Sequence, residues 1–280
     1  MSARRRFQLT RPSWTVPVVL FLSLFFIVPL ISNILRGSAT SEVAQGGFLA
    51  PYIKLFTDPY YFGVLLTTLQ VAVTATVASL VIGYPVAYFM ARYAGRWSGI
   101  MVFVLVAPLL TSIIMRTFGW RVLLSRRGVV NTLLNQVGLV TRPTNISDET
   151  IAVYIGLVHV LVPFMVLSIL AVLQGVDVRL EEAARALGAG RIRTFFTVTL
   201  PLSIDGVITG CILVFVVTNG SFLTMLLLGG GKTTTLSLLI YQQFNMSGDL
   251  GFAAAMGNVL LLMALIGLAL QTAVLRRGQA

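Results

Sequence analysis

Charged residues and cysteine are scarce in this sequence. Only 10% of its 280 residues are charged, and Cys211 and His159 are its one cysteine and one histidine. A lone cysteine excludes an intramolecular disulfide and a metal cluster held by several thiolates. The few carboxylates form no group with His or Cys at catalytic or ligating spacing. The sequence therefore argues against an enzyme and predicts no metal and no cofactor.

Hydrophobic residues make up 57% of the chain, and the mean hydropathy is +0.92. One helical crossing of a bilayer takes about 20 apolar residues. The length therefore suits about six crossings with short connections, and leaves little for a separate soluble domain. The sequence predicts an all-α, polytopic membrane protein, with residues 1–280 as a single transmembrane domain.

Six apolar segments are the expected spans. They cover residues 14–35, 63–91, 100–115, 151–173, 204–228 and 252–275. The first segment is too long for the core of a signal peptide and has no convincing cleavage site, so we expect it to be retained. Residues 116–150 are less apolar, and predict one or two interfacial amphipathic helices joined at Gly128.

Basic residues indicate an orientation. There are 20 of them against 9 acidic residues, an excess that in so apolar a chain suits loops facing anionic lipid better than nucleic acid. With an even number of spans, both termini share a side, and that side holds most of the arginines. The segment between the third and fourth spans is the main exception. We expect both termini on the cytoplasmic side.

The most charged region is residues 174–202, between two hydrophobic spans. Residues 181–187 are good helix formers with acidic groups in the first turn, and Gly188 and Gly190 are placed to end that helix. A second short helix is expected over 191–198, before Pro201 ends it and starts the next span.

The first of these helices carries a small apolar ridge. Ala183, Ala184 and Leu187 form the ridge, and Glu182 and Arg185 border it. A surface of this kind is suited to lie in a groove of a partner protein.

This region resembles the cytoplasmic signature of inner-membrane permease subunits of binding-protein-dependent ABC importers. That signature is Glu-Ala-Ala, three residues, Gly, nine residues, then Ile-x-Leu-Pro. The matching positions are Glu182, Ala183, Ala184, Gly188, Val198, Leu200 and Pro201. Only Val198 departs, conservatively, from the family's Ile.

The resemblance implies a type I (MetI-like) permease fold in a bacterial inner membrane, with residues 174–202 as the coupling loop that docks into an ATPase subunit. It implies these coupling residues: Glu181, Glu182, Ala183, Ala184, Arg185, Leu187, Gly188, Val198, Leu200 and Pro201. The implied partners are two copies of the ATPase, a second homologous permease, and a periplasmic or lipid-anchored solute-binding protein.

A second set of residues resembles the spermidine and putrescine branch of these permeases. The matching residues are Arg116, Thr117, Phe118, Trp120, Gly128 and Asn131, followed by Gly229 and Gly230. Relatives of similar pattern carry ferric ion, sulfate, thiamine or opine-type solutes, so these substrates stay open beside a polyamine. A secondary transporter or channel driven by an ion gradient is the alternative from another class, although the spans lack paired acids.

Residues 229–234, GGGKTT, invite comparison with a phosphate-binding loop. That motif requires a glycine five residues before Gly231, and position 226 is leucine. We expect instead an external turn in which glycine supplies positive φ, and no ATP site in this chain.

Isolated polar residues at membrane depth are the remaining candidates. Asn219, Ser221 and Asn258 suit equally a translocation path or hydrogen bonding between helices, and His159 is expected to be a neutral, hydrogen-bonded residue rather than a proton relay. Three residues between the third and fourth spans are candidates for an external contact: Arg116, Trp120 and Arg121. They could contact a solute-binding protein or anchor the segment at the lipid headgroups.

Overall fold

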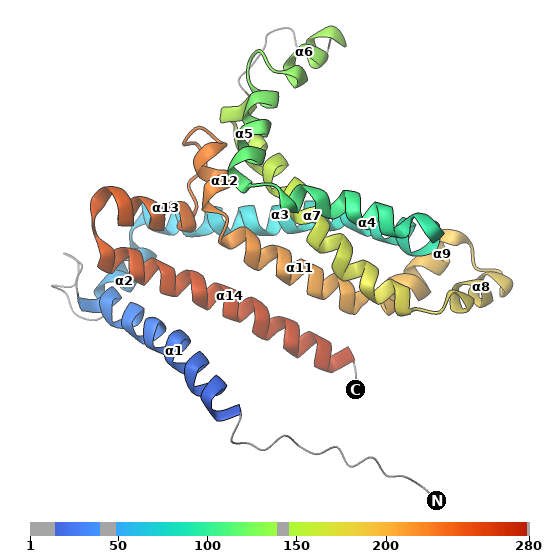
Figure 1. The fold of residues 1–280 in the computed structure, drawn as a ribbon, viewed down its shortest axis with the longest axis horizontal. Helices are drawn as coiled ribbons and strands as arrows, with labels where there is room; N and C mark the ends of the chain where they lie inside the picture. Colours follow the sequence, from blue (N-terminus) through green and yellow to red (C-terminus); the bar gives the residue numbers. More distant parts are fainter. Residues whose placement is uncertain (1–14, 40–48, 139–145, 279–280) are drawn as a thin grey trace, which may run out of the picture.

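The structure of this chain is a computed structural model that describes residues 15–39, 49–138 and 146–278. For 37–39, 271 and 274–278 it describes the backbone alone. Within these ranges every regular element is helical, which confirms the expected all-α fold. The long helices lie side by side in one elongated body, with the N-terminal helix on its outer side (Figure 1).

Three helices form the core: α3 (Pro59–Arg92), α7 (Thr150–Gly175) and α11 (Ile204–Asn219). Met165, Val166 and Ile169 of α7 are fully buried between the other two helices. A hydrophobic cluster of this kind holds the helices together through close packing of many side chains.

Glycines let these three helices approach closely. A Cβ atom added at Gly83 of α3 would lie 2.9 Å from Cγ of Met165, and one at Gly210 of α11 would lie 2.7 Å from its sulfur. At Gly206 the added atom would meet the backbone of Ile169 at 3.0 Å. Small residues at such contacts are typical of helix pairs in membranes.

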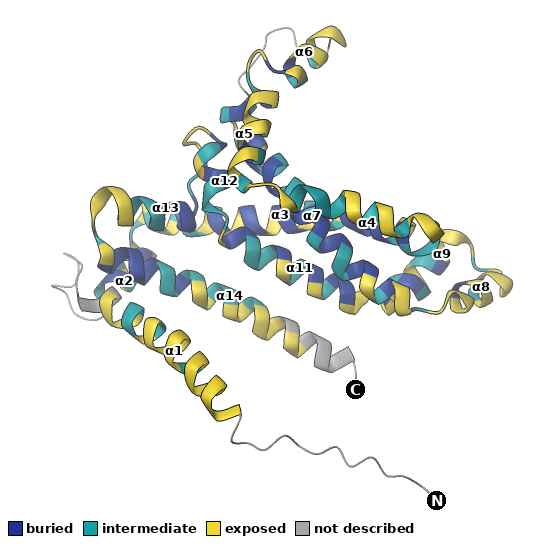
Figure 2. Cartoon of the chain, in the orientation of Figure 1, coloured by how far each residue is buried: buried dark blue, intermediate teal, exposed yellow. Residues whose placement is uncertain are grey.

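Two further helices flank the core. Helix α14 (Leu250–Gly278) packs between α11 and α1 (Thr15–Ala39). A second apolar cluster joins α14 to α2 (Ala50–Thr57), α13 (Leu236–Gln242) and the start of α3 through Leu55, Leu236 and Phe252. Helix α1 leaves nearly all its apolar side chains exposed (Figure 2), as suits a surface that faces lipid or another subunit.

Four helices, α1, α3, α7 and α14, are long and apolar enough to cross a membrane. Two bent pairs raise the number to as many as six. One pair joins Gly95–Leu110 to Ile113–Gln136 with a bend of 93°, and the other joins Arg191–Leu202 to Ile204–Asn219 with a bend of 67°. By length and composition, the described residues thus allow the six spans that the sequence predicts.

The third expected span ends earlier than its prediction of 100–115. Helix α4 (Ser98–Val106) passes into a 3₁₀ turn, Ala107–Leu110, and the chain then bends into α5 (Ile113–Leu124). The carbonyl oxygen of Pro108 accepts from the backbone N–H and hydroxyl of Thr111, and from Nη1 of Arg116 at 2.8 Å. These donors satisfy a carbonyl at the helix end and make the break stable.

The fifth expected span, 204–228, is also interrupted. Helix α11 ends at Asn219, and a separate short helix, α12, covers Phe222–Leu227. The side chains of Asn219 and Ser221 donate to the carbonyls of Phe215 and Val217 at 2.9 and 2.8 Å. Such local bonds compete with the backbone ladder and favour a break at this point.

Helices α5 and α6 (Val129–Gln136) project from the body beside α12 (Figure 1), and Gly128 lies between them as expected. A Cβ atom at Gly128 would come within 2.3 Å of the carbonyl oxygen of Leu123. No other residue type fits this connection without a shift of the backbone.

The GGGKTT segment is a turn, as expected. Gly229, Gly230 and Gly231 have φ of 94°, 50° and 81°, a region that side-chain-bearing residues rarely adopt. The turn is fastened to the start of α7 by a bond between the hydroxyls of Thr233 and Thr150, 2.9 Å apart, and by an ion pair from the following lysine to Glu149.

Candidate functional site

The predicted coupling loop contains helix α8 (Val178–Ala186), which begins earlier than the predicted 181–187. The carboxylate of Asp177 accepts from the backbone N–H of Arg179 at 2.9 Å and caps the helix. Gly188 ends it with φ of 88°, so that the N–H of Ala189 reaches the carbonyl of Ala184 at 3.1 Å. The helix is thus closed at both ends by local bonds.

The tip of α8 is the most prominent part of the loop. Leu187 is 89% exposed, and Glu182, Ala183 and Gly188 are also exposed, whereas Ala184 is half-buried. This leucine is left uncovered by the residues that the structure describes, and its burial against another protein would be favourable.

Glu181, also predicted as a residue of the coupling loop, is buried and does not belong to this exposed face. Its side chain is 1% exposed and pairs with Nη2 of Arg92 at 2.9 Å and with Nη2 of Arg185 at 3.3 Å. Tyr88 adds a hydroxyl that donates to it at 3.4 Å, and Arg92 also donates to the carbonyl of Leu173 at 3.2 Å. The acidic residue of the first turn therefore fastens α8 to the last turns of α3 and α7.

The second helix of the loop also differs from its prediction. Helix α9 covers only Arg191–Thr194, a π-helical turn follows over Phe195–Thr199, and α10 (Leu200–Leu202) runs through Pro201. The bend comes at Ser203, so Pro201 does not end the helix as expected. Proline is tolerated here because it occupies the first turn of α10, where its missing N–H is not needed.

Buried contacts tie this second part of the loop to α3. The hydroxyls of Tyr84 and Ser203 lie 2.7 Å apart, and the ring of Phe195 packs edge-on against Tyr84 with centroids 5.3 Å apart. Val198 and Leu200 are half-buried while Pro201 is exposed. Both halves of the loop are therefore fastened to α3, while its tip is exposed.

The polar candidates inside the membrane segments have internal partners. Asn258 accepts from Asn33 of α1 at 2.7 Å and donates to the hydroxyl of Tyr52 of α2 at 2.9 Å, so it bridges three helices. Asn219 and Ser221 bond to carbonyls of their own helix, at the break described above. Asn258 thus makes bonds between helices, whereas Asn219 and Ser221 bond within one helix, and a translocation path stays a prediction for all three.

His159 accepts from the indole N–H of Trp120 at 3.2 Å, with the two rings edge-to-face at 5.5 Å. The bond joins α7 to α5 and matches the expected hydrogen-bonded histidine. Trp120 is half-buried, and its indole N–H is taken up by this bond. Arg116 is likewise half-buried and bonded to Pro108, which leaves Arg121 as the exposed member of the three candidates for an external contact.

Comparison with known proteins supplies the family. The binding-protein-dependent transport system inner membrane components match residues 9–278. The chain belongs to this family. It is a permease subunit of an ABC importer and a multi-pass protein of the inner membrane.

Similar sequences and structures cover most of the permease. The spermidine/putrescine transport system permease protein PotB of Escherichia coli K12 is 36% identical over 244 residues, which are 86% of this chain and 88% of that protein. PotB of Haemophilus influenzae is 35% identical over 260 residues, or 90% of each chain. A bacterial ABC transporter that imports alginate has a chain of the same fold, with a TM-score of 0.74 at 17% identity over 95% of this chain and 94% of that one.

Several residues that hold the predicted coupling loop in place were missed from the sequence. Arg92, Tyr84 and Ser203 carry its buried polar contacts. The pairs Arg92–Glu181 and Tyr84–Ser203 are separated by 89 and 119 positions, so no local pattern joins them. Arg92 lies just after the end of a predicted span, but an arginine at that position ordinarily contacts lipid headgroups. The sequence therefore offers no reason to expect a buried ion pair there.

Proposed function

We propose that this permease subunit forms part of an importer for a polyamine such as spermidine or putrescine. The observation that carries this proposal is the similarity to PotB, at 36% identity over 86% of the chain. The molybdenum transport system permease protein ModB of Escherichia coli is 32% identical over 76% of the chain. Molybdenum uptake, like that of ferric ion, sulfate, thiamine or opines, is therefore the alternative to test.

The proposed assembly contains this chain, a second homologous permease, two copies of an ATPase subunit and a solute-binding protein. Its support is the family to which the chain belongs, whose members work with a binding protein. In this assembly the ATP site belongs to the ATPase subunits. The GGGKTT turn has a structural role consistent with this, because its bonds fasten it to α7.

The ATPase is proposed to bind the tip of α8, at Glu182, Ala183, Leu187 and Gly188. The exposure of Leu187 supports this choice, since 89% of an apolar side chain is left without a partner. Closure of the ATPase pair would move α8 as a unit. The ion pair of Glu181 with Arg92 and the contact of Ser203 with Tyr84 would then pass the movement to α3 and α11.

Both termini are proposed to be cytoplasmic, on the same side as α8. The charge distribution supports this orientation, because short cytoplasmic loops are enriched in arginine and lysine. The turn at 229–234 and helix α6 would then face the periplasm and the binding protein.

Uptake by the reconstituted complex tests the substrate. The complex is placed in liposomes with ATP inside, and labelled spermidine is added outside with the binding protein. We expect uptake that depends on ATP and on the binding protein, is competed by putrescine and is unaffected by molybdate. Uptake of molybdate in place of spermidine would contradict the polyamine proposal, and uptake that persists without ATP but collapses with a protonophore would favour the gradient-driven alternative.

Cross-linking tests the site of docking. With Cys211→Ser as background, Leu187→Cys places the only thiol of the chain at the tip of α8. We expect cross-linking to the ATPase from this position, and none from a matched exposed control, Val137→Cys beside α6, which is 73% exposed. Cross-linking of the ATPase at position 137 but not at 187 would overturn the proposed docking and the proposed orientation together.

A further inference from the structure

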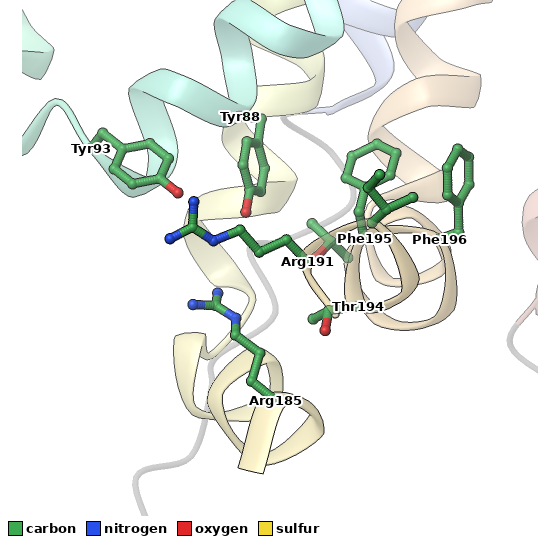
Figure 3. Close-up of a pocket in the computed structure, with 9 residues that line it drawn as sticks. Tyr88, Tyr93, Arg185, Arg191, Thr194, Phe195 and Phe196 are labelled. Atoms are coloured by element: carbon green, nitrogen blue, oxygen red, sulfur yellow. The ribbon is translucent and has the colours of Figure 1, made fainter. Parts of the chain in front are cut away.

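A pocket of about 430 Å³ lies where the coupling loop meets the end of α3. This volume is within the range of small-molecule sites, about 300–1,000 Å³. Figure 3 shows Arg185 of α8 and Arg191 of α9 reaching into the pocket from below the rings of Tyr88 and Tyr93. The family assignment and the proposed docking of α8 leave this pocket without a role.

The pocket has an excess of positive charge. Its lining includes two arginines and no acidic residue. The nearby carboxylate of Glu181 is already paired with Arg92 at 2.9 Å, and Arg185 is a second, longer partner at 3.3 Å. Arg191 makes no ion pair within the part of the chain that the structure describes. Two guanidinium groups so placed suit a phosphate, which arginine binds through two parallel hydrogen bonds.

The polar lining adds further donors to the two arginines. The hydroxyl of Thr194, a residue that lines the pocket, is buried and has no hydrogen-bond partner among the described residues. An unsatisfied buried hydroxyl is costly, so a ligand that supplies an acceptor is favoured at this wall. Tyr93 contributes a second hydroxyl from the opposite side.

Apolar side chains adjoin the charged ones. Ile192 and Phe196, which also line the pocket, are 77% and 60% exposed. They lie four residues apart, on one face of the turn that follows Arg191. A free phosphate offers nothing to cover them, whereas a phospholipid carries acyl chains beside its phosphate.

The level of the pocket also suits a lipid. Tyr93 and Trp97 directly follow α3 and are 66% and 57% exposed, and Arg96 lies over the ring of Trp97 at 5.7 Å. Exposed tyrosine and tryptophan at the end of a membrane helix mark the level of the headgroups. The excess of positive charge disfavours a zwitterionic headgroup with its ammonium and favours an anionic one.

We propose that this pocket binds the phosphate of an anionic phospholipid between Arg185 and Arg191, with the first part of the acyl chains on Ile192 and Phe196. The lipid would occupy the junction of the coupling loop with α3. Binding of the loop to its membrane surroundings would then depend on the headgroup composition at this end of the helices.

Lipid retention tests the proposal without a transport assay. The tagged chain is extracted with its partner subunits in mild detergent, washed, and its retained phosphatidylglycerol, cardiolipin and phosphatidylethanolamine are measured by mass spectrometry. Arg191→Ala is compared with Arg193→Ala, an exposed arginine of the same helix that does not line the pocket. We expect the anionic lipid to fall about tenfold in Arg191→Ala, to fall less in Arg191→Lys, and to be unchanged in the control.

Nanodiscs distinguish the sources of the phosphate. Phosphatidylglycerol in a phosphatidylcholine bilayer should protect Arg191 from a guanidinium-modifying reagent, whereas phosphatidylcholine alone, with or without millimolar inorganic phosphate, should not. Protection by inorganic phosphate alone would replace the lipid with a soluble anion. Equal lipid retention in Arg191→Ala and Arg193→Ala would overturn the proposal, and loss of the ATPase from Arg191→Ala with its lipid intact would assign the pocket to the ATPase surface.

Discussion

At the scale of single residues, the absence of a side chain decides how closely the core helices approach. An added Cβ at Gly206 would meet the backbone of α7 at 3.0 Å, whereas one at Gly210 would meet the flexible end of Met165. Backbone cannot move aside as a thioether can. Gly206 and Gly210 are therefore not equivalent, although both face α7.

We expect Gly206→Ala to destabilise the protein by about 1–3 kcal/mol and Gly210→Ala by less. The measurement is the thermal unfolding midpoint of the purified protein in detergent. Gly63→Ala is the control, because nothing lies within 4 Å of its added Cβ and alanine is the better helix former. Equal effects at positions 206 and 210 would show that α7 shifts to accommodate both.

His159 offers a second test at this scale. Its contact with Trp120 is a hydrogen bond between helices, and such bonds in membranes average about 0.6 kcal/mol. We expect His159→Gln to retain ATP-driven uptake with the same dependence on pH between 6 and 8. A lost or strongly shifted pH profile would mean that the imidazole carries protons during transport, as in the gradient-driven alternative.

At the scale of elements, one buried ion pair fastens α8 to the end of α3. Arg92 is 6% exposed and Glu181 is 1% exposed. Removal of Glu181 leaves a buried guanidinium without its counter-ion, and removal of Arg92 leaves the buried carboxylate with only the longer pair to Arg185. Breaking such a pair costs about 3–5 kcal/mol, whereas replacing both groups by apolar ones of similar size is often neutral. Replacing both residues of the pair can therefore separate its contribution to stability from any role in transmitting movement from α8 to α3.

We expect Arg92→Met and Glu181→Leu each to lower the unfolding midpoint, and the double variant to restore most of it. If the pair also transmits movement, restored stability is not accompanied by restored coupling. ATP hydrolysis in the double variant should then respond several-fold less to the loaded binding protein than in the wild type. Full coupling in a stable double variant would reduce the pair to a structural role.

The elements also show why the helices within two predicted spans are interrupted. Hydropathy is continuous over 204–228, but the amide of Asn219 and the hydroxyl of Ser221 bond to carbonyls of the preceding turn. Within 100–115 the carbonyl oxygen of Pro108 accepts hydrogen bonds from the side chains of Thr111 and Arg116. Both breaks depend on which backbone carbonyl a polar side chain hydrogen-bonds to. A hydropathy average over a window of residues does not contain that information.

At the scale of the whole molecule, the exposed surface is largely apolar. Helix α1 has no buried residue in its apolar window, and it contacts mainly α14 (Figure 2). A water-soluble protein rarely exposes a patch of this extent. The lipid bilayer and a second permease are the two environments that would cover it.

Orientation is testable at this scale with one thiol at a time. In the Cys211→Ser background, a membrane-impermeant maleimide added to intact cells should label Lys232→Cys in the 229–234 turn and not Leu187→Cys. Permeabilisation of cells that lack the ATPase subunits should then make position 187 accessible, which rules out a buried thiol as the cause. The reverse pattern would place the coupling loop outside and contradict cytoplasmic termini.

The order of residues by itself determined the membrane character and the all-α fold, and it predicts the coupling loop. These features depend on continuous hydropathy and on short-range spacing, such as Glu182 to Gly188 and Val198 to Pro201. Both can be read directly from the sequence. The Gly128 connection and the glycine turn at 229–231 were likewise readable, because few residue types fit their geometry.

Only the tertiary structure decided which side chains meet across the chain. Glu181 and Glu182 are neighbours of identical chemistry, yet one is buried against Arg92 and the other is exposed at the tip of α8. Asn258 became a bridge between helices, and Trp120 a partner of His159, for the same reason. The burial of a polar group depends on a partner brought from a distant helix, and a one-dimensional pattern does not record which helices pack together.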